Sequence, residues 1–357
     1  MFEIYRQTLI YCSSDNVILI ENTIFTKTKR RYLYKLTAKR EESLTKRVNI
    51  ITLLSYISLM CLGQQDPQIS QIMFNQMFVN PGYAGSNDMI CFTALNRQSW
   101  VGFDGAPSTT LFHINAPFNL FGVNSGAGLS IMNDQAGFND NININFSYAY
   151  KIDLASGKLG IGLGLGMMNK ALEPNWTIPT SDYHTPASGD PLIPENNESY
   201  LAFDMGFGAY YKTREFYVGI SSTHLNEAKI KYSKGTPYMK RHYYIIAGYH
   251  LPINNPMIEV TPSIFLFSDG RTSQLNINTN VQYNKKFWGG VTYRAGDAII
   301  GLVGIELFNG IRVGYAYDFA TSDIRKNSSG SHELMVNYCF NLSINRSPRS
   351  YKSVRFL

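Results

Sequence analysis

Large apolar residues alternate with small polar residues along most of the chain. In the segment 140–153, Ile142, Ile144 and Phe146 share one face, while asparagine and serine occupy the other. The same alternation recurs in three later segments, residues 273–284, 310–320 and 331–343. Successive side chains of a β-strand point to opposite faces, so this period of two predicts β-strands.

The alternation predicts about fourteen strands, near residues 88–97, 108–117, 126–134, 140–153, 158–170, 199–212, 215–224, 239–250, 257–268, 273–284, 287–294, 298–308, 310–320 and 331–343. Connections after even-numbered strands are short, whereas several after odd-numbered strands are long, such as 171–198 and 225–239. Short periplasmic turns and longer outer loops are typical of a transmembrane antiparallel β-barrel. We therefore predict an all-β, multi-pass barrel over residues 88–343 in the outer membrane of a Gram-negative bacterium. An even strand number places both of its ends in the periplasm.

A soluble β-sandwich is the alternative fold, since its strands also alternate. The polar faces favour the barrel, because they consist mostly of Asn, Gln, Gly and Ser, as a polar lumen would. The apolar faces end repeatedly in Tyr, Phe or Trp, which matches the aromatic girdles at the two membrane interfaces. Outer-membrane lipid is therefore the expected surrounding of the strands.

Charge is low and unevenly distributed. Charged residues make up 16% of the chain, against about 25% in an average soluble protein. Residues 1–63 hold 10 basic and 5 acidic residues, which leaves 22 basic and 21 acidic residues in the remainder. A nearly neutral chain lacks the basic surface that binds a polyanion. We therefore expect no nucleic-acid partner.

The N-terminal region has the pattern of a targeting sequence. Two basic residues precede an apolar run of about 15 residues and a small residue, which predicts a signal peptide over 46–63. A lipid anchor on Cys61 is disfavoured by the bulky Met60 before it. Residues 1–45 are then either the result of a mis-assigned start or an unusually long leader.

Two stretches flank the predicted barrel. Residues 64–87 are polar, aromatic and too irregular for a strand, and we expect them at or in the lumen, entering from the periplasm or lying across its mouth. There Gln71, Asn75 and Asn80 would supply hydrogen bonds; the alternative is a disordered periplasmic leader. The tail 344–357 carries four basic residues. It either meets an acidic partner or is a solvated extension.

The sequence offers no catalytic, cofactor or metal site. The charged residues at inward positions are expected to form structural ion pairs: Lys151, Asp204, Glu259, Arg294, Glu306, Arg312 and Asp318. His242 and His250 share an inward face, but they lie about 26 Å apart along a strand and cannot share a metal. The glycine run at 160–166 lacks the spacing of a phosphate loop. It is predicted to be a strand whose inward glycines leave room for lumen content.

Two cysteines, Cys91 and Cys339, fall in the first and last predicted strands. Their parity in the strands places both side chains inward, and both residues lie toward the periplasmic end of their strands. The first and last strands are neighbours when a barrel closes. The two residues are therefore either disulfide-bonded or two free thiols at the seam.

Five short motifs occur in order, at residues 65–75 with 79–86, at 96–107, at 293–298, at 314–318 and at 330–333. Together they resemble the PorP/SprF family over residues 65–340. The matching positions are candidate partner-contact or structural residues: Asp66, Pro67, Gln68, Asn75, Asn80, Pro81, Tyr83, Gly85, Arg97, Trp100, Gly102, Phe103, Arg294, Asp297, Tyr317, Asp318 and His332. Trp100 and Phe103 either anchor the first outer loop at the lipid interface or contact a secreted partner. The leader and the basic tail depart from the family pattern.

The resemblance implies a non-enzymatic outer-membrane component of the type IX secretion and gliding machinery. Its implied partners are a large secreted surface adhesin and the periplasmic ring components, including lipoproteins, beneath the membrane. Two other classes of function remain open from the barrel alone. One is a general or substrate-specific porin, and the other is a structural or adhesive outer-membrane protein.

Overall fold

The computed structural model describes residues 9–13, 16–20, 66–174, 194, 196–307 and 310–341. The chain divides into two compact units, with the boundary after Cys61. In the first unit, β1 (Leu9–Ser13) and β2 (Asn16–Ile20) pair as antiparallel strands. The expected signal peptide 46–63 and tail 344–357 lie outside the described residues, as does most of the leader. No helix among the described residues is long and apolar enough to cross a membrane.

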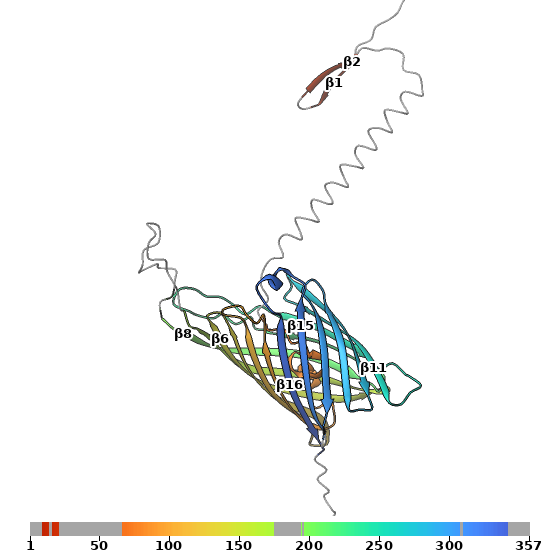
Figure 1. The fold of residues 1–357 in the computed structure, drawn as a ribbon. Coiled ribbons are helices and arrows are strands. Elements are labelled where there is room, and N and C mark those ends of the chain that lie inside the picture. Colours follow the sequence, from red (N-terminus) through yellow and green to blue (C-terminus); the bar gives the residue numbers. More distant parts are fainter. Residues whose placement is uncertain are drawn as a thin grey trace, which may run out of the picture. The chain divides into compact units, whose positions relative to one another are not determined.

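The second unit contains a closed antiparallel barrel, shown in Figure 1. Its strands are β3 (Ile90–Gln98), β4 (Ser108–Leu120), β5 (Val123–Ala136), β6 (Asn139–Leu154), β7 (Gly157–Leu172), β8 (Glu198–Lys212), β9 (Phe216–Thr223), β10 (His242–Tyr249), β11 (Ile258–Ser268), β12 (Ser273–Tyr283), β13 (Phe287–Arg294), β14 (Ala298–Glu306), β15 (Ile311–Ala320) and β16 (Ser331–Phe340). Each strand pairs with its neighbours in sequence, and β16 pairs with β3 to close the barrel. The predicted fold and its fourteen strands are confirmed.

The outer face of the barrel is apolar, as the alternation predicts. Ile142, Ile144 and Phe146 of β6 are all about half exposed on this face. Exposed aromatic residues gather at both ends of the strands. One row comprises Phe92, Phe118, Tyr150, Phe216, Tyr249, Tyr283 and Phe287, and the other comprises Phe138, Tyr243, Tyr293 and Phe319. These rows match the two girdles of a membrane barrel, so the lipid surface follows directly from the period-two pattern.

The connections differ at the two ends of the barrel. At one end β4 and β5 are joined by Phe121 and Gly122, whose φ angles of 50° and 85° suit a tight two-residue hairpin. At the other end lie the long connections 99–107, 173–197, 224–241 and 321–330. We call these the short-turn end and the long-loop end. The short-turn end departs from the expectation in one connection, 250–257, which is longer than a hairpin turn.

The seam between β16 and β3 carries a covalent link. Cys339 is the direct cross-strand partner of Cys91, their Cα atoms lie 4.1 Å apart, and the structure places a disulfide between them. Cys91 is buried on the inner face near the short-turn end. Of the two alternatives that the sequence left open, the structure therefore has the bridge. It joins the first and last strands of the barrel.

We expect non-reducing peptide mass spectrometry of the purified protein to recover a Cys91–Cys339 linked peptide. Replacement of both residues by serine should leave the barrel folded but less stable by about 2–4 kcal/mol, because the unfolded chain loses a long-range constraint. A free, alkylatable thiol at either position in the native protein would exclude the bridge.

Candidate functional site

The lumen of the barrel contains residues 66–88, which we call the luminal segment (Figure 1, orange). It forms three single turns of 3₁₀ helix, η1 (Ile72–Phe74), η2 (Gln76–Phe78) and η3 (Pro81–Tyr83). Its first residue, Asp66, contacts histidines at the long-loop end. Its last residue, Asp88, pairs with Lys158 of β7 at the short-turn end, at 2.9 Å. The segment therefore runs from the long-loop end to the short-turn end, which differs from the expected entry through the periplasmic mouth.

Apolar packing holds much of the luminal segment against the wall. Ile69, Ile72 and Val79 are each at most 6% exposed and belong to a buried cluster with wall residues of nine strands. Met77 and Tyr83 belong to a second buried cluster with Tyr210, Tyr217 and Ile246. The lumen is thus partly an apolar core, whereas the sequence predicted a polar lumen.

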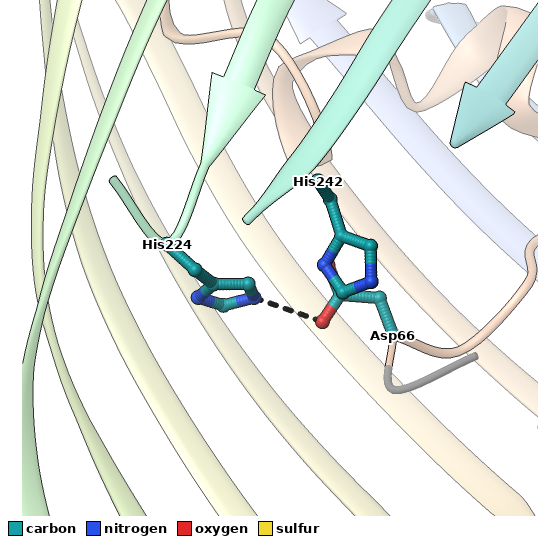
Figure 2. Close-up of side chains that lie close together, drawn as sticks. All are labelled: Asp66, His224 and His242. Atoms are coloured by element: carbon teal, nitrogen blue, oxygen red, sulfur yellow. Dashed lines mark hydrogen bonds and ion pairs between the residues drawn. The ribbon is translucent and has the colours of Figure 1, made fainter. Parts of the chain in front are cut away.

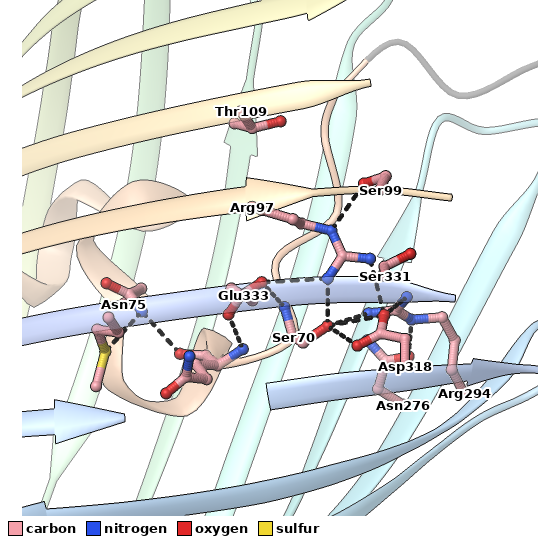
Figure 3. Close-up of polar contacts among 12 residues, drawn as sticks. Ser70, Asn75, Arg97, Ser99, Thr109, Asn276, Arg294, Asp318, Ser331 and Glu333 are labelled. Carbon is pink, nitrogen blue, oxygen red and sulfur yellow. Dashed lines mark hydrogen bonds and ion pairs between the residues drawn. The ribbon is translucent and has the colours of Figure 1, made fainter. Parts of the chain in front are cut away.

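A group of four charged wall residues lies beside the start of the luminal segment (Figure 3). Arg97 of β3 contacts Asp318 of β15 at 2.8 Å and Glu333 of β16 at 3.3 Å. Arg294 of β13 contacts the same Asp318 carboxylate at 3.0 Å. All four side chains are at most 5% exposed. Two positive and two negative charges balance, as buried charges must.

The luminal segment completes the hydrogen bonding of this charge cluster. The backbone N–H groups of Ser70 and Gln71 donate to the two oxygens of Glu333, at 2.7 and 2.8 Å. The Ser70 hydroxyl accepts from Arg97 at 2.7 Å and donates to Asp318 at 2.7 Å. A hydrogen bond to a charged group contributes about 1.5–3 kcal/mol. The cluster is therefore a strong anchor for the segment.

The middle of the segment is held by Asn80 and by a glycine-lined wall. The Asn80 amide donates to the backbone oxygens of Ala209 and Ile220, at 3.1 and 3.3 Å, and its carbonyl oxygen accepts from Gly82. A Cβ atom on Gly162 of β7 would lie 2.4 Å from the backbone of Pro81 and Gly82. The predicted role of the inward glycines is thus confirmed: they let two backbones approach.

Near the short-turn end the contacts become more open. The Gly85 N–H donates to the Asn115 side chain at 3.3 Å, and the Gly85 carbonyl accepts from Lys151. Beyond this point lie two cavities of about 640 and 530 Å³. Lys151, Lys158, Lys212 and Arg214 line the first, and Glu259, Glu306 and Arg312 line the second. Those inward charges therefore face a wide vestibule.

The segment is closely fitted to the wall at its other end. Three cavities there, lined by both the segment and wall strands, measure about 10 Å³ each. A space of this size holds about one water molecule. The described part of the lumen is thus tightly filled around residues 66–72, whereas the cavity of about 530 Å³ begins beside Met73, Phe74 and Gln76 and lies toward the short turns.

Asp66 lies between two histidines of neighbouring strand ends (Figure 2). Its carboxylate is 3.0 Å from Nε2 of His224, which follows β9, and 3.2 Å from Nδ1 of His242, the first residue of β10. Tyr244 donates its hydroxyl to the same carboxylate at 2.6 Å. Burial alone would raise the pKa of Asp66, but His224 and His242 outweigh it and hold that pKa well below its usual value. Asp66 is therefore an ionised carboxylate.

The sequence did not reveal this grouping. It pointed to His242 and His250, which the structure places at opposite ends of β10, as expected from their spacing. His224 was not paired with His242, although both flank one loop between adjacent strands. Their position at the facing ends of adjacent strands could have been used to predict that the two histidines lie close together. No local sequence pattern predicts that Asp66 contacts them.

The candidate residues named from the sequence separate into three groups. The luminal group comprises Asp66, Pro67, Gln68, Asn75, Asn80, Pro81, Tyr83, Gly85, Arg97, Arg294 and Asp318. The outer loop holds Trp100, Gly102 and Phe103, and Asp297 lies in the turn after Arg294. Tyr317 and His332 pack edge to face on β15 and β16, at 5.0 Å between ring centroids. The structure thus gathers the first group inside the barrel, while Tyr317 and His332 contact each other and Asp297 lies 3.5 Å from Arg294.

The expected hydrogen-bonding roles of two amides also differ in detail. Gln71 reaches the wall through its backbone N–H, while its side-chain amide has no hydrogen-bond partner among the described residues. Asn75 donates mainly to the Gln71 carbonyl of its own segment, at 2.8 Å. Of the three amides, Asn80 is the one whose side chain bonds to wall backbone, at the carbonyl oxygens of Ala209 and Ile220.

Substitution of Gly162 by alanine should loosen the luminal segment, since the added methyl group would overlap the backbone of Pro81 and Gly82. We expect a loss of about 1–3 kcal/mol in stability, the usual cost of overpacking. Gly164→Ala on the same strand is the control, because its methyl group would meet only the Asn145 side chain. The gel shift between folded and heat-unfolded barrel measures both; equal effects would contradict the close approach at Gly162.

An epitope inserted between Gln65 and Asp66 should be accessible on intact cells, because Asp66 lies at the long-loop end. A membrane-impermeant maleimide should likewise reach Lys234→Cys in the loop 224–241 and spare Lys285→Cys in a short turn. Labelling of Lys285→Cys alone would show that the barrel has the opposite orientation in the membrane. An epitope reached only after permeabilisation, with Lys234→Cys labelled, would contradict the path of the segment.

Comparison with solved structures supports the barrel architecture. CymD, a monoaromatic hydrocarbon channel, is 13% identical with a TM-score of 0.50, over 80% of this chain and 96% of that chain. The outer membrane protein Omp33 of Acinetobacter baumannii is 8% identical with a TM-score of 0.43, over 71% and 99%. The toluene transporter TbuX of Ralstonia pickettii is 13% identical with a TM-score of 0.44, over 74% and 93%. At such identities the likeness to CymD shows the fold alone.

No protein of curated function matches the sequence. Residues 62–338 match the family described as type IX secretion system membrane protein PorP/SprF. This range covers the whole luminal segment and nearly all of the barrel, and it agrees with the resemblance read from the five motifs. The chain therefore belongs to the PorP/SprF family of type IX secretion system membrane proteins and is a multi-pass barrel of the outer membrane.

Proposed function

We propose that this protein is a non-enzymatic component of the type IX secretion and gliding apparatus that helps to export or hold large surface proteins such as adhesins. In this proposal it also connects to the periplasmic ring and its lipoproteins. The family match supports a role in secretion. The observation that carries the proposal is the occupied lumen.

A porin needs an open path for its solute, and this barrel has its own chain in that path. The luminal segment is anchored by the charge cluster at Arg97, by Asn80 and by Gly85. Three cavities lined by residues near the start of the segment each have room for about one water molecule, and the larger cavity of about 530 Å³ reaches the segment only from Met73 onward. Work by contact at the two faces therefore suits the molecule better than passage of solutes through it.

The two faces differ in what they offer a partner. The short-turn end has the larger cavities, with Lys151, Lys158, Lys212 and Arg214 around one of them against Asp88 and Asp153. An acidic surface of a periplasmic partner would complement this excess of positive charge, and such attraction weakens with salt. The long loops at the other end suit an exported chain, since binding residues concentrate on loops held by a rigid scaffold.

The genetic test is deletion of the gene followed by complementation. Full-length protein should restore surface display of one large exported protein, whereas versions lacking 178–193 or 344–357 test the outer loop and the tail separately. Both segments lie outside the described residues. Conductance of the purified barrel in a planar bilayer is the companion measurement, and we expect it to be weak.

The opposite results would favour the alternative function. Normal display of every exported protein in the deletion strain, with impaired uptake of a small solute, would support a porin. Strong conductance by the full-length barrel would point the same way, because it requires an open lumen. A general growth defect without either change would support a purely structural role in the envelope.

A further inference from the structure

Three side chains at the long-loop end have the composition of a metal site (Figure 2). Asp66, His224 and His242 each offer one ligand atom, and these atoms lie within 4.8 Å of one another. Their exposures are 15%, 5% and 0%. They come from the luminal segment and from the facing ends of β9 and β10. The group therefore forms only when the barrel closes around the segment.

The hydrogen bonding of His224 leaves its second nitrogen facing a carboxylate. Nδ1 of His224 lies 2.9 Å from the Asp204 carboxylate of β8, which can only accept, so Nδ1 carries the proton. Nε2 then faces the Asp66 carboxylate at 3.0 Å. A neutral imidazole presents a lone pair there, and two acceptors at this distance need a proton or a metal ion between them.

His242 makes the case for a metal ion stronger than the case for a proton. Its ring is fully buried, and neither nitrogen makes a hydrogen bond among the described residues, although Nδ1 lies 3.2 Å from Asp66. A proton on His224 would satisfy that histidine and leave Nδ1 of His242 facing the carboxylate at 3.2 Å without a hydrogen bond. A single cation bound by all three groups would engage both histidines, through Nε2 of His224 and Nδ1 of His242.

We propose that Asp66, His224 and His242 bind a divalent transition-metal ion, best suited to Zn²⁺, that ties the start of the luminal segment to the ends of β9 and β10. Two imidazoles and a carboxylate are ligands that Zn²⁺ accepts at about 2.0–2.2 Å, which sets neighbouring ligand atoms about 3–3.5 Å apart. The two carboxylate–imidazole separations, 3.0 Å to Oδ1 and 3.2 Å to Oδ2 of Asp66, have this size, and the remaining separations are at most 4.8 Å.

Two further features fit such a site. Asp204 holds His224 through its other nitrogen, which is the usual outer support of a metal-bound histidine. A cavity of about 10 Å³ adjoins Asp66 and His224 and has room for about one water as a fourth ligand. The proposed ion is structural: it fixes one end of the luminal segment, at the mouth opposite the disulfide.

Co²⁺ titration of the full-length barrel, purified in detergent and freed of metal, tests the site. We expect one equivalent of Co²⁺ to give visible d–d absorption that Zn²⁺ abolishes. Asp66→Asn and His242→Gln should each remove this absorption. Asp204→Asn should weaken Co²⁺ binding about 10–100-fold, because it acts only through His224. His250→Gln is the matched control, since His250 directly follows the same strand and bonds to Thr261 at 3.0 Å.

The gel shift of the folded barrel verifies that each variant is intact, and Asp66→Asn lies outside the barrel wall, so it leaves the strands unchanged. Absence of Co²⁺ absorption in the folded native barrel would overturn the proposal. Absorption that persists in both Asp66→Asn and His242→Gln, or that is lost in His250→Gln, would also overturn it, because the ion would then be bound elsewhere. None of these readouts depends on secretion.

Discussion

The architecture depends on the pairing of buried charges with the backbone of the luminal segment. Glu333 is fully buried, and Arg97 alone cannot fill the acceptor positions of its two oxygens. Backbone N–H groups of an irregular segment are equally costly when buried without partners. The same hydrogen bonds satisfy both groups: the backbone N–H groups of Ser70 and Gln71 donate to the Glu333 carboxylate. The segment forms no strand in which these N–H groups could find other partners. The wall and its filling are thus one folded unit.

This pairing explains features of the wall that membrane insertion does not require. Lipid constrains the outward residues of β7. The inward glycines of β7 are required by the luminal segment, because a methyl group at Gly162 would overlap the segment's backbone. Apolar residues such as Leu111 and Ile300 also lie inside the barrel, where a water-filled channel would have polar ones. Much of the inner face therefore has the composition of a protein core. This argues against a luminal segment that reversibly leaves the barrel.

The strands could be predicted from the sequence because lipid and lumen impose a strict period of two, and closure of the sheet then brought Cys91 beside Cys339. The luminal segment has no period, so its existence could be inferred from composition but its contacts could not. Asp66 reaches His224 across 158 residues of chain, and no local pattern encodes such a contact. The direction of the segment was missed for a related reason: strand number fixes where strands end, not how the preceding chain is routed.

The two ends of the lumen are built differently, and that difference bears on function. At the long-loop end the charge cluster, the apolar packing and the group at Asp66 close the interior around the segment. At the short-turn end the wall opens into cavities of about 640 and 530 Å³ lined by charged side chains. A solute channel must be accessible from both sides, whereas a docking protein needs one receptive face and a stable opposite end. An interior closed toward the long loops and open toward the short turns supports the docking role proposed above.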